Sequence, residues 1–178
     1  MRLFFGLSLP DSIRREAQRR AGAAALLIPG RYGSAENYHI TLAFLGDVPA
    51  ERVSDASGVL TKCVSDMPAP RLTLGGTAFF GRAQNAILIL DVISDPPLAA
   101  LHDSLVRGLD AKGLCFSPGP FSPHITLARH AAVPEDCLHT LTGPAASFVP
   151  ERAHLFLSAR NEAGQIAYTP IFDAYFAR

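Results

Sequence analysis

The spacing of apolar residues along the chain predicts a mixture of helices and strands. Apolar residues recur at helical spacing in four stretches, and glycine or proline ends the pattern. These stretches predict helices over 11–27, 50–64, 96–112 and 134–141. Compact runs of β-favouring residues predict strands over 2–9, 38–45, 72–74, 86–92 and 121–129. A final hairpin is predicted over 151–158 and 165–176, with Pro170 at a sheet edge because proline donates no ladder hydrogen bond.

The order of these elements repeats once along the chain. A strand, a helix and a strand that carries a histidine occur in the first half, and the same order returns in the second half. His39 and His124 occupy the matching place in the two units. This internal duplication predicts an α+β protein with two similar sheets. We expect residues 1–178 to form one domain of two lobes.

Composition narrows the classes of function. Of the 178 residues 48% are hydrophobic, which suffices for a packed core and excludes a disordered chain. The 16 Lys+Arg balance the 16 Asp+Glu, so no general basic field holds long nucleic acid, although a short RNA end or a nucleotide remains a candidate ligand. No apolar run approaches the roughly 18 residues of a membrane span. Three scattered cysteines favour a reducing cytosol over disulfides or a zinc site.

The repeated strands share the sequence His-Ile-Thr-Leu, at 39–42 and at 124–127. Because strand residues alternate between faces, His39 and Thr41 share one face while the apolar residues pack behind them. The same alternation puts His124 and Thr126 together. A single His-x-Thr on a strand is a weak signal, and its repetition at matching places favours a functional site. The remaining histidines lack any such context; His102 is expected at a helix edge.

Four such side chains around one cleft suit the hydrolysis of a phosphodiester. Histidine titrates near pH 6.5, so one imidazole can act as a general base while the other, protonated, acts as a general acid. Threonine hydroxyls can donate hydrogen bonds to the nonbridging phosphate oxygens, where charge accumulates in the transition state. The two motifs are near copies, so the residues alone leave open which histidine is the acid.

Segments 2–10, 36–46 and 121–129 carry a specific resemblance to a known family. The chain resembles the 2H phosphoesterase superfamily, and within it the RNA 2′,3′-cyclic phosphodiesterases, also called 2′-5′ RNA ligase-like proteins. The resemblance implies two pseudo-symmetric α+β lobes with antiparallel sheets flanked by helices, and a catalytic cleft between them. It implies no metal and no other cofactor. The implied substrates are RNA 3′ ends with a 2′,3′-cyclic phosphate, or cyclic nucleotides, and we expect a cytoplasmic monomer.

The resemblance also implies roles for single residues. His39 would be the proton donor and His124 the proton acceptor, which leaves a 2′-phosphate as product. Arg129 would contact the phosphate, but strict alternation places it on the opposite face from His124, so a bulge is required there. Phe4 or Phe5 could stack on a base, with core packing as the competing interpretation.

Three other functions stay open at this point. The chain could act on a different ester, such as a 2′-5′ linked oligonucleotide or ADP-ribose cyclic phosphate. It could carry out RNA 2′-5′ ligation. It could also bind RNA or nucleotides without catalysis, although binding alone needs no acid–base pair.

Overall fold

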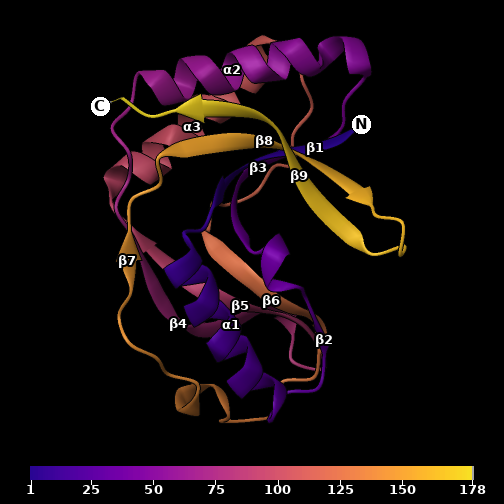
Figure 1. The fold of residues 1–178 in the computed structure, drawn as a ribbon, viewed down its shortest axis with the longest axis vertical. Helices are drawn as coiled ribbons and strands as arrows, with labels where there is room; N and C mark the ends of the chain where they lie inside the picture. Colours follow the sequence, from indigo (N-terminus) through magenta and orange to yellow (C-terminus); the bar gives the residue numbers. More distant parts are fainter. Residues whose placement is uncertain (178) are drawn as a thin grey trace.

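The computed structural model describes residues 1–177, and within that range the α+β class predicted from the sequence is confirmed. The helices are α1 (Asp11–Ala25), α2 (Val53–Ser65) and α3 (Pro96–Ala111), and the 3₁₀ turns are η1 (Ala35–Asn37), η2 (Ala50–Arg52) and η3 (Leu138–Thr140). The strands are β1 (Arg2–Ser8), β2 (Arg31–Tyr32), β3 (His39–Asp47), β4 (Leu72–Arg82), β5 (Asn85–Ser94), β6 (His124–Ala131), β7 (Ser147–Phe148), β8 (Arg152–Arg160) and β9 (Ile166–Tyr175). Figure 1 shows α2 and α3 together at one end of the molecule and α1 apart from them.

The strands form one antiparallel sheet that consists of two halves. Its order is β7-β4-β5-β6-β3-β1-β8-β9, with β2 alongside β6. One half contains β3, β1, β8 and β9, and the other contains β6, β5, β4 and β7 (Figure 1). The halves meet where β3 and β6 share a single register pair, Ile40 with Ile125. The two similar sheets expected from the sequence are therefore joined into one by this pair.

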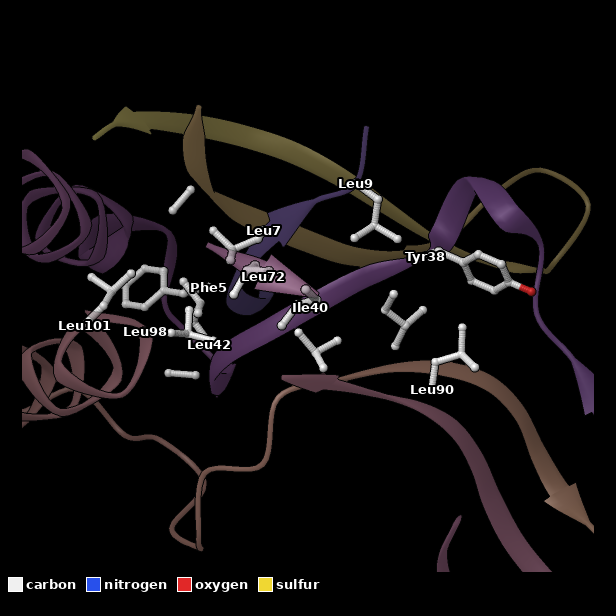
Figure 2. Close-up of a cluster of buried hydrophobic side chains, with 14 of the residues drawn as sticks. Phe5, Leu7, Leu9, Tyr38, Ile40, Leu42, Leu72, Leu90, Leu98 and Leu101 are labelled. Carbon is white, nitrogen blue, oxygen red and sulfur yellow. The ribbon is translucent and has the colours of Figure 1, made fainter. Parts of the chain in front are cut away.

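A row of four buried side chains crosses the junction. Leu7 of β1 lies opposite Ile40, and Leu90 of β5 lies opposite Ile125. All four residues have 0% of their surface exposed. Figure 2 shows Leu7, Ile40 and Leu90 in the core, with Leu98 of α3 nearby. A slip of one residue between β3 and β6 would turn this row to solvent, so burial of the row fixes the register.

Beyond this row the next inward-facing residues of β3 and β6 have carbonyls bonded by groups from outside the β3–β6 pair. The Leu42 carbonyl of β3 accepts a hydrogen bond from His102 Nδ1 of α3 at 2.7 Å. The Leu127 carbonyl of β6 accepts one from the Gly33 amide at 3.0 Å. The His102 ring also stacks on Phe121, with 4.2 Å between ring centroids. His102 therefore links β3 to the segment that precedes β6, which the expectation of a helix-edge residue did not include.

Two elements differ clearly from the sequence predictions, and one prediction about an edge strand is confirmed. β4 extends over eleven residues instead of ending at 74, because Gly75 and Gly76 lie at a shift of register rather than at a strand end. A Cβ on Gly75 would lie 3.0 Å from the Asp91 Cβ, so the glycine marks a close approach of two strands. The helix predicted over 134–141 is only the short turn η3. Pro170 does lie in the edge strand β9, next to the residue that the β8–β9 register skips.

A buried arginine attaches α1 to the second half of the sheet. Arg20 is 4% exposed, and its guanidinium donates to Glu16 Oε1 at 2.8 Å, to the Gly75 carbonyl at 2.7 Å and to the Pro144 carbonyl at 2.6 Å. Hydrogen bonds from Arg19 and Arg20 outweigh the effect of burial and lower the pKa of Glu16 to about 2. The arginine thus gives two backbone carbonyls, from β4 and from the loop before β7, a charged donor.

Replacing Arg20 should destabilise the fold much more than replacing Arg19. Arg20→Ala removes the charged donor from the Gly75 and Pro144 carbonyls, and we expect it to lower the free energy of unfolding by about 2–3 kcal/mol. Arg19→Ala is the matched control, because Arg19 also forms an ion pair with Glu16 but lies at an exposed position. Denaturant unfolding of both variants measures the difference. Equal effects would show that Arg20 acts only through Glu16.

Candidate active site

The junction between the two halves of the sheet brings the two His-x-Thr motifs together. Ile40 follows His39 and Ile125 follows His124, so the antiparallel register places His39 opposite Thr126 and Thr41 opposite His124. Because both isoleucines point into the core, the flanking histidines and threonines point to the other face. All four of these side chains line one cleft of about 1060 Å³. The constellation expected from the sequence is present.

The two imidazoles are held in the same way. His39 Nδ1 lies 2.7 Å from the Asn37 carbonyl, and His124 Nδ1 lies 2.8 Å from the Ser122 carbonyl. A carbonyl can only accept, so in each ring Nδ1 carries the proton and Nε2 is left to exchange one. The Thr41 hydroxyl lies 3.1 Å from His39 Nε2, to which it can donate. Each motif therefore presents one nitrogen suited to proton transfer.

Aromatic rings surround the His39 imidazole. The His39 ring lies 4.7 Å from the Phe4 ring and 4.8 Å from the Tyr168 ring, measured between centroids. This burial, with the charges of His124 and Arg129, lowers the pKa of His39 to about 4, against the opposing hydrogen bond to the Asn37 carbonyl. His39 is therefore neutral at pH 7 in the ligand-free protein.

Arg129 reaches the cleft through a bulge in β6. The β5–β6 register advances from the pair Ile89–Thr126 to the pair Leu88–Ala128, which skips Leu127. Leu127 and Ala128 are consequently both buried, at 0% and 1% exposure, and the next residue returns to the cleft. The bulge that a cleft-facing Arg129 requires is therefore present.

The same bulge occurs in β3 and brings Phe44 into the cleft. The β1–β3 register skips Leu42 as it advances from Thr41 to Ala43. Phe44 then lines the cleft at the place in the first motif that Arg129 occupies in the second. Arg2 lies over its ring, 4.9 Å from the centroid. The sequence analysis missed Phe44, although its position five residues after His39 matches that of Arg129 after His124.

The two phenylalanines that could stack on a base pack against other side chains of the protein. Phe5 is 0% exposed and belongs to the core, so it is not available to a ligand. Phe4 lines the cleft but is only 2% exposed, because its ring packs on His39 and stacks on Phe156 at 4.9 Å. Among the cleft aromatics Phe44 retains more exposed surface than Phe4.

The cleft is basic in a chain that has no net charge. Four arginines and no carboxylate line it among the described residues: Arg2, Arg31, Arg129 and Arg160. Arg31 of β2 and Arg129 of β6 are direct partners in the register. Like charges directly opposite one another destabilise a sheet, and an anion between them relieves that repulsion. The cleft is therefore suited to a phosphate or another anion.

Outside the cleft, His154 forms a separate polar cluster. It is 6% exposed and lies between Ser8 Oγ at 2.9 Å and Asp173 Oδ1 at 2.7 Å, so it links β1 to β9. Residues 1–177 contain no group of three or more His, Cys, Asp or Glu side chains arranged to hold a metal ion. None of the helices in that range is long and apolar enough to cross a membrane.

Comparison with known proteins identifies the family. The sequence model of the 2′-5′ RNA ligase superfamily matches residues 9–162. The chain belongs to this superfamily.

Members of the superfamily resemble the chain in sequence and in structure. A protein of Escherichia coli named RNA 2′,3′-cyclic phosphodiesterase is 35% identical over 133 residues, which cover 74% of this chain and 73% of that protein. One of the same name from Geobacillus stearothermophilus is 31% identical over 152 residues, or 82% of this chain and 48% of that protein, so the match spans about half of that relative. The crystal structure of E. coli LigT complexed with 3′-AMP superimposes with a TM-score of 0.79 at 30% identity, covering 99% and 98% of the two chains.

The lowered pKa of His39 should make this superfamily member lose stability in weak acid. The folded pKa is about 4 and the ordinary value is 6.5, so between these values the unfolded chain binds more protons than the folded one. The His39 contribution to stability is complete above pH 6.5 and is lost as the pH falls toward 4. His39→Gln should therefore flatten the pH dependence of the free energy of unfolding in that window, which denaturant titrations at several pH values measure. Parallel curves for wild type and variant would contradict the lowered pKa.

Proposed function

We propose that this chain hydrolyses 2′,3′-cyclic phosphates, at RNA 3′ ends or on nucleotides, to 2′-phosphomonoesters. The main support for the proposal is that the two His-x-Thr motifs face one another in a basic cleft. Two relatives named RNA 2′,3′-cyclic phosphodiesterase support it, and so does a structural relative, LigT, that was crystallised with 3′-AMP. The scale of the cleft, about 1060 Å³, leaves room for a nucleotide and part of its neighbour.

The reaction needs two proton transfers, one at each imidazole. His124 Nε2 takes a proton from water as the oxygen attacks phosphorus, and the bond from phosphorus to the ribose 3′ oxygen breaks on the opposite side. His39 Nε2 gives its proton to that departing oxygen, which becomes the 3′ hydroxyl. The phosphate remains on the 2′ oxygen. After the step His124 is protonated and His39 is neutral, so the pair must exchange protons with solvent before the next cycle.

The low pKa of His39 is compatible with an acid role once substrate is bound. In the ligand-free protein burial, and after it the positive charges of His124 and Arg129, disfavour protonation of His39. An anionic phosphodiester bound beside His39 places a negative charge next to the imidazole, which favours the protonated form and raises the pKa of His39. Thr41, Thr126 and Arg129 supply donors to the nonbridging oxygens of the same phosphate.

Loss of either imidazole should abolish most of the turnover. His39→Ala and His124→Ala are each expected to reduce kcat with 2′,3′-cyclic AMP by roughly 100- to 10,000-fold, because each removes a general acid or base. His139→Ala, at an exposed position in η3, serves as the matched control and should retain wild-type turnover. All assays contain EDTA, since imidazoles alone handle both protons in this mechanism. Wild-type activity in folded His124→Ala would contradict the mechanism. Loss of activity in EDTA that a divalent metal restores would also contradict it.

The product should be a single isomer. The two ends of the cleft differ, because Phe44 occupies in one lobe the place that Arg129 holds in the other. We therefore expect the ribose to bind in one orientation, with its 3′ oxygen toward His39, so that 2′,3′-cyclic AMP yields almost only 2′-AMP. Chromatography separates 2′-AMP from 3′-AMP. A mainly 3′ product would reverse the orientation, and an equal mixture would contradict separate acid and base roles.

The other candidate functions predict different outcomes in a substrate panel. Faster turnover of a 2′-5′ linked dinucleotide or of ADP-ribose cyclic phosphate would assign a different ester. Tight binding without turnover would assign a binding module. We also infer a cytoplasmic monomer; the support for a reducing compartment is that Cys63, Cys115 and Cys137 are all free thiols.

A further inference from the structure

The β8–β9 hairpin extends beyond the rest of the sheet and forms one wall of the cleft. Strand β8 pairs with β1 only as far as Leu157 opposite Leu3, whereas β8 and β9 continue together to Arg160 opposite Ile166. We call residues 158–168 the hairpin tip; Figure 1 shows it extending past β1. The tip contributes Arg160 and Tyr168 to the cleft. It therefore needs an attachment of its own if its side chains are to stay in place.

Asn37 provides that attachment. Its Nδ2 donates to the Ile166 carbonyl at 2.7 Å, and its Oδ1 accepts from the Tyr168 amide at 3.3 Å. These are the side-chain hydrogen bonds that join the tip to the remainder of the described chain. The two backbone groups lie two residues apart on the free edge of β9, so one amide side chain bonds them as a neighbouring strand would.

The same residue holds the imidazole that the tip covers. The Asn37 carbonyl accepts the Nδ1 proton of His39 at 2.7 Å. With the tip attached, the Tyr168 ring stands edge-on to the His39 ring, at 4.8 Å and 77°, and edge-on to the Phe4 ring at 5.1 Å. The backbone of Asn37 thus orients the imidazole, and its side chain positions the aromatic cover.

We propose that Asn37 is a positioning residue whose side-chain amide fastens the hairpin tip over the cleft, so that Tyr168 shields the His39 imidazole from water. An amide suits this task because it donates to one backbone atom and accepts from another, which neither a carboxylate nor an aliphatic side chain does. The catalytic consequence rests on the proposed function, since it matters to turnover only if His39 transfers a proton.

The titratable groups that face His39 make the shielding measurable. They are His124 and Arg129 of β6 and Tyr168 of β9, and the other rings against it, Phe4 of β1 and Phe156 of β8, are uncharged. None of these groups is negative at neutral pH. Burial is the largest cause of the lowered His39 pKa, so removal of the cover should raise that pKa from about 4 toward 6.5.

The test is an NMR titration of the His39 imidazole in protein with labelled histidine, assigned by comparison with His39→Gln. Asn37→Ala keeps the carbonyl that holds Nδ1 and removes only the attachment. We expect Asn37→Ala to raise the midpoint by about one pH unit or more. Tyr168→Ala should raise it in the same way, and Tyr168→Phe should leave it unchanged. The double variant Asn37→Ala/Tyr168→Ala should shift it no further than the larger single change, because both act on one contact.

Two further variants make the result specific. Asn85→Ala removes an amide contact in the other half of the sheet, to His130 at 2.9 Å, and should leave the midpoint at its wild-type value. Asn37→Ser repeats the test with a polar side chain that is too short to span both backbone atoms. A wild-type midpoint in Asn37→Ala and Asn37→Ser, alongside a raised one in Tyr168→Ala, would overturn the role of Asn37. Unchanged midpoints in all three would overturn the shielding by Tyr168.

The titration needs no substrate, so it separates this inference from the proposed function. Raised midpoints in a protein that hydrolyses no cyclic phosphate would support the positioning role and contradict the function. Hydrolysis with an unmoved midpoint would support the function and contradict the positioning role. If both hold, the acidic limb of the kcat/KM profile moves with the NMR midpoint in each variant.

Discussion

The site depends on one backbone pair, Ile40 with Ile125, where the two halves of the sheet meet. Both side chains are fully buried, and Leu7 and Leu90 extend the buried row on either side. Because side chains alternate along a strand, burying this row forces its polar neighbours onto the opposite face. A shift of one residue would bury the histidines and expose the isoleucines, so hydrophobic burial fixes the register that brings the two motifs together.

The same frame carries two unlike walls, and this difference gives the cleft a direction. One bulge, repeated in β3 and β6, returns Phe44 to the cleft in the first lobe and Arg129 in the second. His39 lies beneath aromatic rings, with its pKa lowered by burial, whereas His124 contacts a single ring, that of Phe80. Symmetry of the backbone therefore presents two imidazole nitrogens to the cleft, and the different side chains around them are the basis of the distinct roles that we propose for them.

The sequence predicts the parts of the site that follow local periodicity and misses those that depend on distant contacts. The faces of His39 and His124 follow from alternation, and the duplicated order of elements points to their meeting. Phe44 was missed because alternation fails at a bulge, and only the second motif, through Arg129, signals that bulge. Strand β2, two residues long, has no periodic pattern and exists through its pairing with β6. Asn37 bonds to a hairpin far along the chain, which no local pattern encodes.

We propose that the Ile40–Ile125 junction gathers both motifs around one phosphate. A crystal structure of the protein with 2′-AMP tests this most directly, because it locates the phosphate relative to all four side chains. We expect a phosphate within hydrogen-bond distance, about 2.6–3.2 Å, of Nε2 of both His39 and His124, with at least one threonine hydroxyl donating to it. A phosphate that contacts only one histidine, or that binds elsewhere in the cleft while both imidazoles remain free, would contradict it.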